Sequence, residues 1–184
     1  MNPDRRRVST HEAGHAIAAT VLGLSPVAFS LLPDGKGGHV SHGPANELTT
    51  AGCRAEIVVS VAGTVAERIA YRHRQAVMGS DTIAASRAAV KIHGTDCSPE
   101  QIEAELARGE RDAERLLRSH WPAVRRLARQ MEALYGTLDG LATLLLAGGH
   151  QDPVATALEL APPVAPLRIA ATSTAPSEVQ EMKP

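Results

Sequence analysis

The chain of 184 residues carries a net charge of −1, and 43% of its residues are hydrophobic but only 2% are aromatic. The near-neutral charge excludes the electrostatic attraction of basic proteins to nucleic acid or anionic membranes, the few rings exclude a base-stacking platform, and two cysteines exclude a disulfide scaffold. Because no stretch approaches the roughly 20 apolar residues of a membrane span and no secretory signal is recognisable, we expect a cytoplasmic protein with an aliphatic core.

The first predicted helix, over 9–22, carries the pattern His-Glu-x-x-His. Its two histidines, His11 and His15, are four residues apart, so both imidazoles lie on one helix face and reach a single metal ion. Glu12 lies close to the water that such an ion binds, where a carboxylate serves as general base. The pattern therefore indicates a zinc peptidase site, with His11 and His15 as metal ligands and Glu12 as the catalytic residue.

The ends and the interior of this helix give further signals. Ser9 and Thr10 are expected to cap its start, and Gly23 is expected to end it. Gly14 lies between the two histidines, where a glycine costs roughly 1 kcal/mol relative to alanine. We expect another backbone segment to approach the helix closely at Gly14, because such a contact would explain the glycine.

Two short strands are predicted after this helix. Residues 26–32 have the β-branched and aromatic content of a strand, and turn-forming residues follow at 33–35. A second strand is predicted over 39–42, directly after a pair of glycines. Together the two segments predict a small β hairpin or sheet edge beside the active site.

The rest of the folded part is predicted to be helical, so the fold class is mostly α, with the hairpin making it α+β. The predicted helices cover 49–72, 82–93, 98–136 with an interruption near Pro122, and 138–147. Thr49 or Thr50 is expected to cap the first of these helices, and Ser98 the third. Ser80 or Asp81 is expected to open the second.

The helical pattern stops near the C-terminus. Residues 148–184 are rich in proline and alanine and lack helical periodicity, so they are predicted to form a flexible tail beyond a domain over 1–147. Within the domain, 99–119 alternates charged and apolar residues and is expected to be an amphipathic surface helix. Cys53 and Cys97 are expected to be reduced thiols.

A catalytic zinc ion needs a third protein ligand. One familiar extension of the motif puts a third histidine six residues after the second, but that position is Val21. His39 and His42 are three residues apart, so on a strand they point to opposite faces and cannot both bind one ion. The remaining candidates are Glu56, Glu67, Asp81, Asp96, His39, His42, His73 and His93.

Four blocks of the sequence resemble the proteolytic domain of the FtsH-type ATP-dependent zinc metalloproteases. They are His-Glu-Ala-Gly-His-Ala over 11–16, Ala-Gly-Thr-Val-Ala-Glu-Arg over 62–68, Gly-Ser-Asp over 79–81 with Ala85 four residues later, and Thr-Leu-Asp-Gly over 137–140. The blocks occur in the family's order with similar gaps. The resemblance therefore covers roughly residues 8 to 147.

The resemblance implies a helical metalloprotease domain that holds one zinc ion per chain, with Asp81 as the third ligand. An aspartate at a helix start agrees with this role, because it is held rigidly and offers the hard oxygen that complements two imidazoles. Glu67 is either a residue that orients a ligand histidine or the partner of a neighbouring arginine. The strand around Gly38, His39 and Val40 is expected to pair with an extended substrate.

The ATPase module and the membrane spans of that family have no counterpart in these 184 residues. We therefore expect a zinc metalloendopeptidase that cleaves unfolded or extended polypeptides and is ATP-independent by itself. By resemblance, its partners include a hexameric homo-oligomer and a separate ATPase. The alternative is a catalytically idle zinc-binding interaction or regulatory module, but Glu12 favours the enzyme because metal binding alone requires only the ligands.

Overall fold

The computed structural model describes residues 3–24, 27–31, 37–46, 49–72 and 79–134. Within these residues the chain is mostly helical, as predicted. The elements are α1 (Pro3–Val21), β1 (Val27–Leu31), β2 (Gly38–His42), α2 (Thr50–Tyr71), α3 (Ser80–His93), α4 (Pro99–Ser119) and α5 (Trp121–Leu134). The predicted helix over 138–147 and the predicted tail over 148–184 lie outside the described residues, so the domain boundary at 147 stays a prediction.

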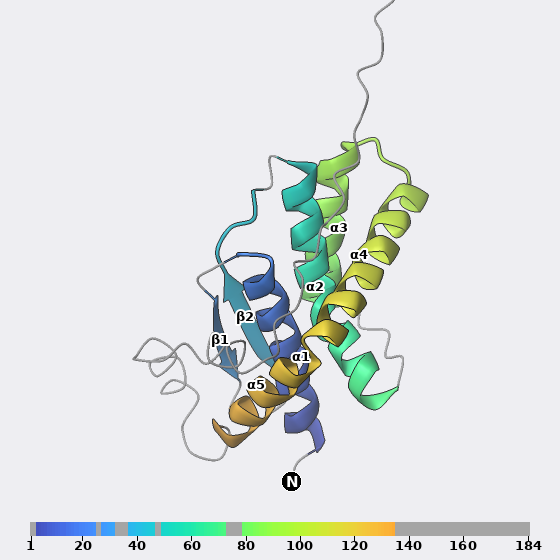
Figure 1. The fold of residues 1–184 in the computed structure, drawn as a ribbon. Helices are drawn as coiled ribbons and strands as arrows, with labels where there is room; N and C mark the ends of the chain where they lie inside the picture. The colour runs from blue at the N-terminus through green and yellow to red at the C-terminus, as the bar shows by residue number, and fades with distance from the viewer. Residues whose placement is uncertain (1–2, 25–26, 32–36, 47–48, 73–78, 135–184) are drawn as a thin grey trace, which may run out of the picture.

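Helix α1, which carries the histidine motif, lies at the centre of the packing. The hairpin lies on one side of α1 and α2 lies on the other, while α5 crosses α1 near the N-terminal end of α1 (Figure 1). Helices α3 and α4 pack against the far side of α2. The main core joins these layers through buried aliphatic side chains that include Ile17, Val65 and Leu127. None of the described helices combines the length and the apolar character needed to cross a membrane.

The start of α1 differs from the prediction. The helix begins at Pro3, so Ser9 and Thr10 are interior residues rather than caps. Proline is well suited to a first helical position, because its missing N–H would have no partner there. The hydroxyl of Thr10 instead donates to the carbonyl oxygen of Arg6, one turn earlier, at 2.9 Å. The end is as predicted, with Gly23 at a φ of 76° after the last turn.

Gly14 lies at a close approach of α1 and α2. A Cβ atom at this position would lie 2.7 Å from the carbonyl oxygen of Ala62 and 2.7 Å from Cβ of Ala66. No side chain fits in that space, so the predicted close approach of a second backbone is confirmed. The contact brings the middle of α2 directly against the histidine motif.

The caps of α2 and α4 match the sequence signals. The hydroxyl of Thr49 accepts a hydrogen bond from the backbone N–H of Gly52 at 3.0 Å. Ser98 and Gln101 form a reciprocal capping box at the start of α4. Both caps join residues three apart in the sequence, and this explains why local patterns were sufficient to predict them.

Helix α3 begins at Ser80, two residues before the predicted range of 82–93. Gly79 occupies the N-cap position and makes no side-chain cap hydrogen bond, while Ser80 and Asp81 lie within the first turn. The helix therefore opens at Ser80, one of the two predicted residues, although neither Ser80 nor Asp81 is its N-cap. The carboxylate of Asp81 instead contacts histidines of α1, and this contact fixes the end of α3 against the motif.

Helix α4 is amphipathic, but its polar face is not wholly on the surface. Glu105 is only 7% exposed and accepts hydrogen bonds from Nε and Nη2 of Arg54 at 3.1 and 2.9 Å. This pair joins α2 to α4 through a fork geometry that suits two parallel charge-assisted bonds. The helix is interrupted at His120, between α4 and α5, and Pro122 is the second residue of α5. The predicted interruption near Pro122 is therefore confirmed.

Strands β1 and β2 pair in antiparallel register, with Val27 opposite His42 and Phe29 opposite Val40. Phe29 is 4% exposed and belongs to the main core. Burial alternates along β2, with the side chain of His39 exposed and that of His42 half-buried. The strand packs against α1 and thereby forms one wall beside the histidine motif.

Candidate metal centre

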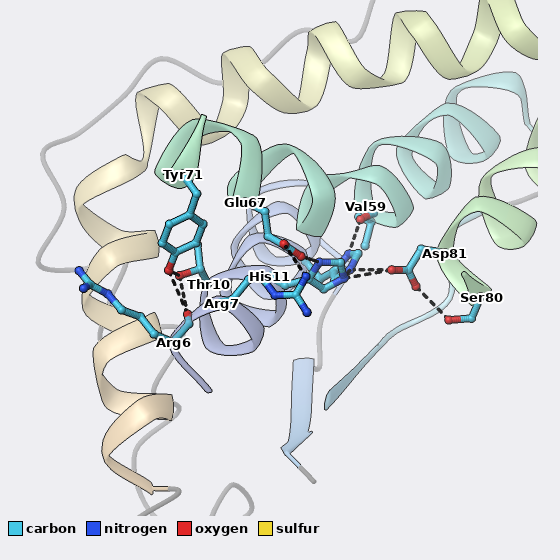
Figure 2. A network of polar contacts seen from close by, with 10 residues as sticks. Arg6, Arg7, Thr10, His11, Val59, Glu67, Tyr71, Ser80 and Asp81 are labelled. Carbon is cyan, nitrogen blue, oxygen red and sulfur yellow. Dashed lines mark hydrogen bonds and ion pairs between the residues drawn. The ribbon is translucent and has the colours of Figure 1, made fainter. Parts of the chain in front are cut away.

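The structure brings His11, His15 and Asp81 together, although 70 residues separate the first from the last. The Nε2 atoms of His11 and His15 are 2.9 Å apart. Oδ2 of Asp81 lies 3.1 Å from Nε2 of His11 and 3.2 Å from Nε2 of His15. Figure 2 shows His11 with Asp81 on one side and Glu67 on the other. Among the described residues this is the group of histidines and carboxylates that could hold a metal ion.

The size of this triangle fits a tetrahedral zinc ion. Zinc lies about 2.0 to 2.1 Å from imidazole nitrogen and carboxylate oxygen, so two tetrahedral ligand atoms are about 3.3 Å apart. The three observed separations, from 2.9 to 3.2 Å, are within a few tenths of an ångström of that value. Two imidazoles and one carboxylate also match the donor types of catalytic zinc sites.

The outer nitrogen of each histidine has a partner that fixes the ring. Nδ1 of His15 lies 2.7 Å from the carbonyl oxygen of Val59, and Nδ1 of His11 lies 2.7 Å from Oε1 of Glu67. Since both partners are acceptors, we place a proton on Nδ1 of each ring, so that Nε2 would present its lone pair to a bound ion. Metal-binding histidines characteristically have such acceptors on the outer nitrogen.

Glu67 contacts both of the groups that the sequence offered as its partners, a histidine of the motif and a neighbouring arginine. Its Oε1 contacts His11, and its Oε2 lies 3.7 Å from Nη1 of Arg7. The arginine is one turn before His11 on the same helix, so the three side chains form a short chain from the surface to the cluster (Figure 2). The guanidinium of Arg7 thereby helps to orient the carboxylate that holds His11.

The cluster attracts positive charge. Burial disfavours the charged form of His11, but hydrogen bonds to Asp81 and Glu67 raise the pKa of His11 to about 9. Burial acts to raise the pKa of Asp81 as well, yet hydrogen bonds from His11 and His15 hold it well below its usual range. Without a metal the site therefore takes up a proton, and a bound cation would replace that proton.

Glu12 lies beside the cluster and is 5% exposed. Burial raises the pKa of Glu12 above the ordinary value, and the neighbouring His15 and His11 act in the opposite direction. A Cβ atom at Gly38 would lie 2.7 Å from Cγ of Glu12, so β2 comes directly against this side chain. A carboxylate with a raised pKa, held in place by a strand, is suited to accept and return a proton.

The cluster lies in a cleft of about 530 Å³ formed by α1, β2, α2 and the start of α3. Gly38, His39 and Val40, the predicted substrate strand, all line this cleft. A volume of this size accommodates a short peptide segment. The cleft also reaches Glu56 and His42, whose side chains lie 3.7 Å apart beyond the cluster.

The other candidate ligands lie outside the triangle. His39 and His42 are on opposite faces of β2, as their spacing predicts. Nε2 of His93 is 3.5 Å from Oε1 of Glu105, at the contact between α3 and α4. Asp96 is exposed after the end of α3. His73 lies outside the described residues.

Two features of the site were not predicted from the sequence. A Cβ atom at Gly63 would lie 2.3 Å from Nε2 of His15 and 2.5 Å from Nε2 of His11, so α2 approaches the cluster through a glycine. A glycine inside a predicted helix was the signal that would have identified this contact, as it did for Gly14. The carbonyl of Val59 had no signal, because every residue carries that group.

No family model matches the chain, and no curated protein gives a match to it. The function is therefore inferred from the geometry of the cluster and the cleft.

Proposed function

We propose that the chain is a zinc metalloendopeptidase that hydrolyses peptide bonds of unfolded or extended polypeptides and is ATP-independent by itself. His11, His15 and Asp81 would hold one zinc ion per chain. The observation that carries the proposal is the position of a buried Glu12 carboxylate beside three donor atoms that are at most 3.2 Å apart. The resemblance of the same blocks to the FtsH-type protease domain supports it.

Zinc bound in this site would polarise the scissile carbonyl and lower the pKa of a water molecule toward about 7. Glu12 accepts the proton of the attacking water and returns it to the leaving amine. Burial supports this role, because it raises the pKa of Glu12 and so makes the carboxylate a stronger proton acceptor. His11 and His15 are held by Glu67 and the Val59 carbonyl, so neither ring needs to reorient during the reaction.

The second strand supports binding of an extended substrate. Among the described residues β2 pairs only with β1, so the other edge of β2 presents backbone groups to a further strand. Gly38, His39 and Val40 line the cleft along this strand. Pairing with backbone groups places few demands on the substrate's side chains, and therefore suits unfolded polypeptides.

The substitution Glu12→Gln tests the proposal. We expect the variant to retain zinc, measured by elemental analysis, and to lose cleavage of unfolded casein. The matched control is Glu110→Gln on α4. The side chain of Glu110 is 47% exposed and does not line the cleft of the cluster. Undiminished cleavage by Glu12→Gln would refute the general-base role, and wild-type protein that binds zinc without cleaving casein would favour the idle interaction or regulatory module.

Ligation is tested separately with Asp81→Ala. We expect the zinc content of this variant to fall, because two imidazoles alone make an incomplete site. Full occupancy in the variant would remove Asp81 from the ligand set. A hexameric assembly and a separate ATPase partner stay predictions that native mass spectrometry with and without added ATPase subunits would test.

A further inference from the structure

A second cavity, of about 300 Å³, lies between α1, the end of α2 and α5. Arg6 and Thr10 line this cavity, while Arg7 and His11, the next residue in each case, line the cleft of the metal cluster. Helix α1 is therefore the wall between the two spaces. Figure 2 shows Arg6 directed away from the side on which Asp81 lies.

Three guanidinium groups surround the cavity. Arg125 and Arg129 are one turn apart on α5 and so share a helix face, and Arg6 joins them from α1. All three side chains are exposed, and among the residues that the structure describes none of them makes an ion pair. By contrast, the guanidiniums of Arg54 and Arg68 are paired with glutamates.

Hydrogen bonds fix the wall of the cavity that α1 and α2 form. The hydroxyl of Tyr71 lies 3.1 Å from Oγ1 of Thr10 and donates to the carbonyl oxygen of Arg6 at 3.3 Å (Figure 2). These contacts connect α2 to the first turns of α1. Trp121 adds an aromatic surface one turn before Arg125.

Glu132 also lines the cavity, and it supplies the opposite charge. Its Oε1 atom is buried and has no hydrogen-bond partner among the described residues. A buried oxygen without a donor costs free energy, so a ligand that donates a hydrogen bond to Glu132 would be favoured. The cavity therefore combines three cationic side chains with one unsatisfied acceptor.

We propose that this cavity binds a small molecule that carries an oxyanion group, phosphate or carboxylate, together with a hydrogen-bond donor. The guanidiniums of Arg6, Arg125 and Arg129 contact the oxyanion, because their planar fork matches phosphate and carboxylate geometry. The donor, an ammonium or a hydroxyl, contacts Oε1 of Glu132. This inference does not depend on the peptidase proposal.

Trp121 allows direct measurement, because it is the one tryptophan of the chain and lines the cavity. The full chain is titrated with inorganic phosphate, O-phosphoethanolamine, acetate and glycine in chloride buffer of constant ionic strength. Tryptophan fluorescence reports occupancy, and calorimetry reports affinity. We expect saturable binding of at least one probe, tighter for the probe that carries an ammonium than for its simpler counterpart. The better pair, phosphate or carboxylate, identifies the oxyanion.

The double variant Arg125→Gln, Arg129→Gln is expected to weaken binding by about tenfold or more, since it removes two charge-assisted contacts. The control Arg115→Gln, Arg118→Gln removes the same charge from exposed positions of α4 and is expected to leave affinity unchanged. Equal loss in both double variants, or equal signals from potassium chloride alone, would overturn the proposal. The absence of saturable binding to all four probes would do so too. Repeating the titration with EDTA separates this result from the metal site.

Discussion

Gly63 and His15 lie so close together that a Cβ atom on the glycine would be 2.3 Å from Nε2 of the imidazole. The same atom would lie 2.5 Å from Nε2 of His11. Helix α2 thus presents bare backbone to the atoms that would bind zinc, and the site depends on a missing side chain as well as on its ligands.

The substitution Gly63→Ala should abolish zinc binding while leaving the helices intact. The added methyl group cannot avoid both imidazoles, because both distances are well under van der Waals contact, so at least one ring must turn away. Elemental analysis after dialysis measures zinc content, and circular dichroism checks the fold. Thr64→Ala, at the next position of α2, is the control. Stoichiometric zinc in Gly63→Ala would contradict the geometry.

Glu67→Gln should lower zinc affinity by roughly tenfold to a hundredfold, the usual effect of changing a group behind a ligand histidine. The amide oxygen can still accept from Nδ1 of His11, but the negative charge that makes the imidazole a stronger ligand is lost. Competition with a chromophoric chelator measures the affinity, and Glu110→Gln serves as the control. Unchanged affinity would show that Glu67 pairs with Arg7 without strengthening zinc binding.

The features predicted correctly from the sequence are mostly local. The spacing of His11 and His15 is sufficient to place both rings on one helix face, and the capping box of Ser98 joins residues three apart. Gly14 was informative for a different reason, because a glycine inside a helix has a cost that only close packing explains.

The wrong predictions, and the contacts that were not predicted, depend on residues that are distant in the sequence. Ser9 is fully buried inside α1, so a residue that would cap a helix in isolation is here a core residue. Glu105 is buried because Arg54, 51 residues earlier, meets it across α2 and α4. Residue chemistry alone left several candidates for the third ligand, and the position of Asp81 depends on how α3 packs against α2.

Gly38→Ala should reduce turnover while zinc stays bound. A Cβ atom at Gly38 would come within 2.7 Å of Cγ and 2.9 Å of Oε1 of Glu12, so the carboxylate must move away from its position beside the cluster. We expect kcat to fall by about tenfold or more, because a small displacement of a proton acceptor is costly. Casein cleavage and elemental analysis measure the two effects. Ser41→Ala, exposed on the same strand, is the control, and normal kcat in Gly38→Ala would show that Glu12 tolerates the shift.

Glu105→Gln should lower the free energy of unfolding at pH 7 by about 3 kcal/mol, because it removes the carboxylate charge that the buried guanidinium of Arg54 contacts. Hydrogen bonds from Arg54 hold the pKa of Glu105 below its ordinary value, against the effect of burial. Its stabilising contribution is therefore complete above the unfolded pKa of about 4.3 and is lost as the pH falls through the lower folded pKa. Urea denaturation at a series of pH values should show a smaller acid loss in the variant than in the wild type. Glu110→Gln, which removes an exposed charge from the same helix, should change stability by less than about 1 kcal/mol, and an equal effect of both substitutions would contradict the burial of the pair.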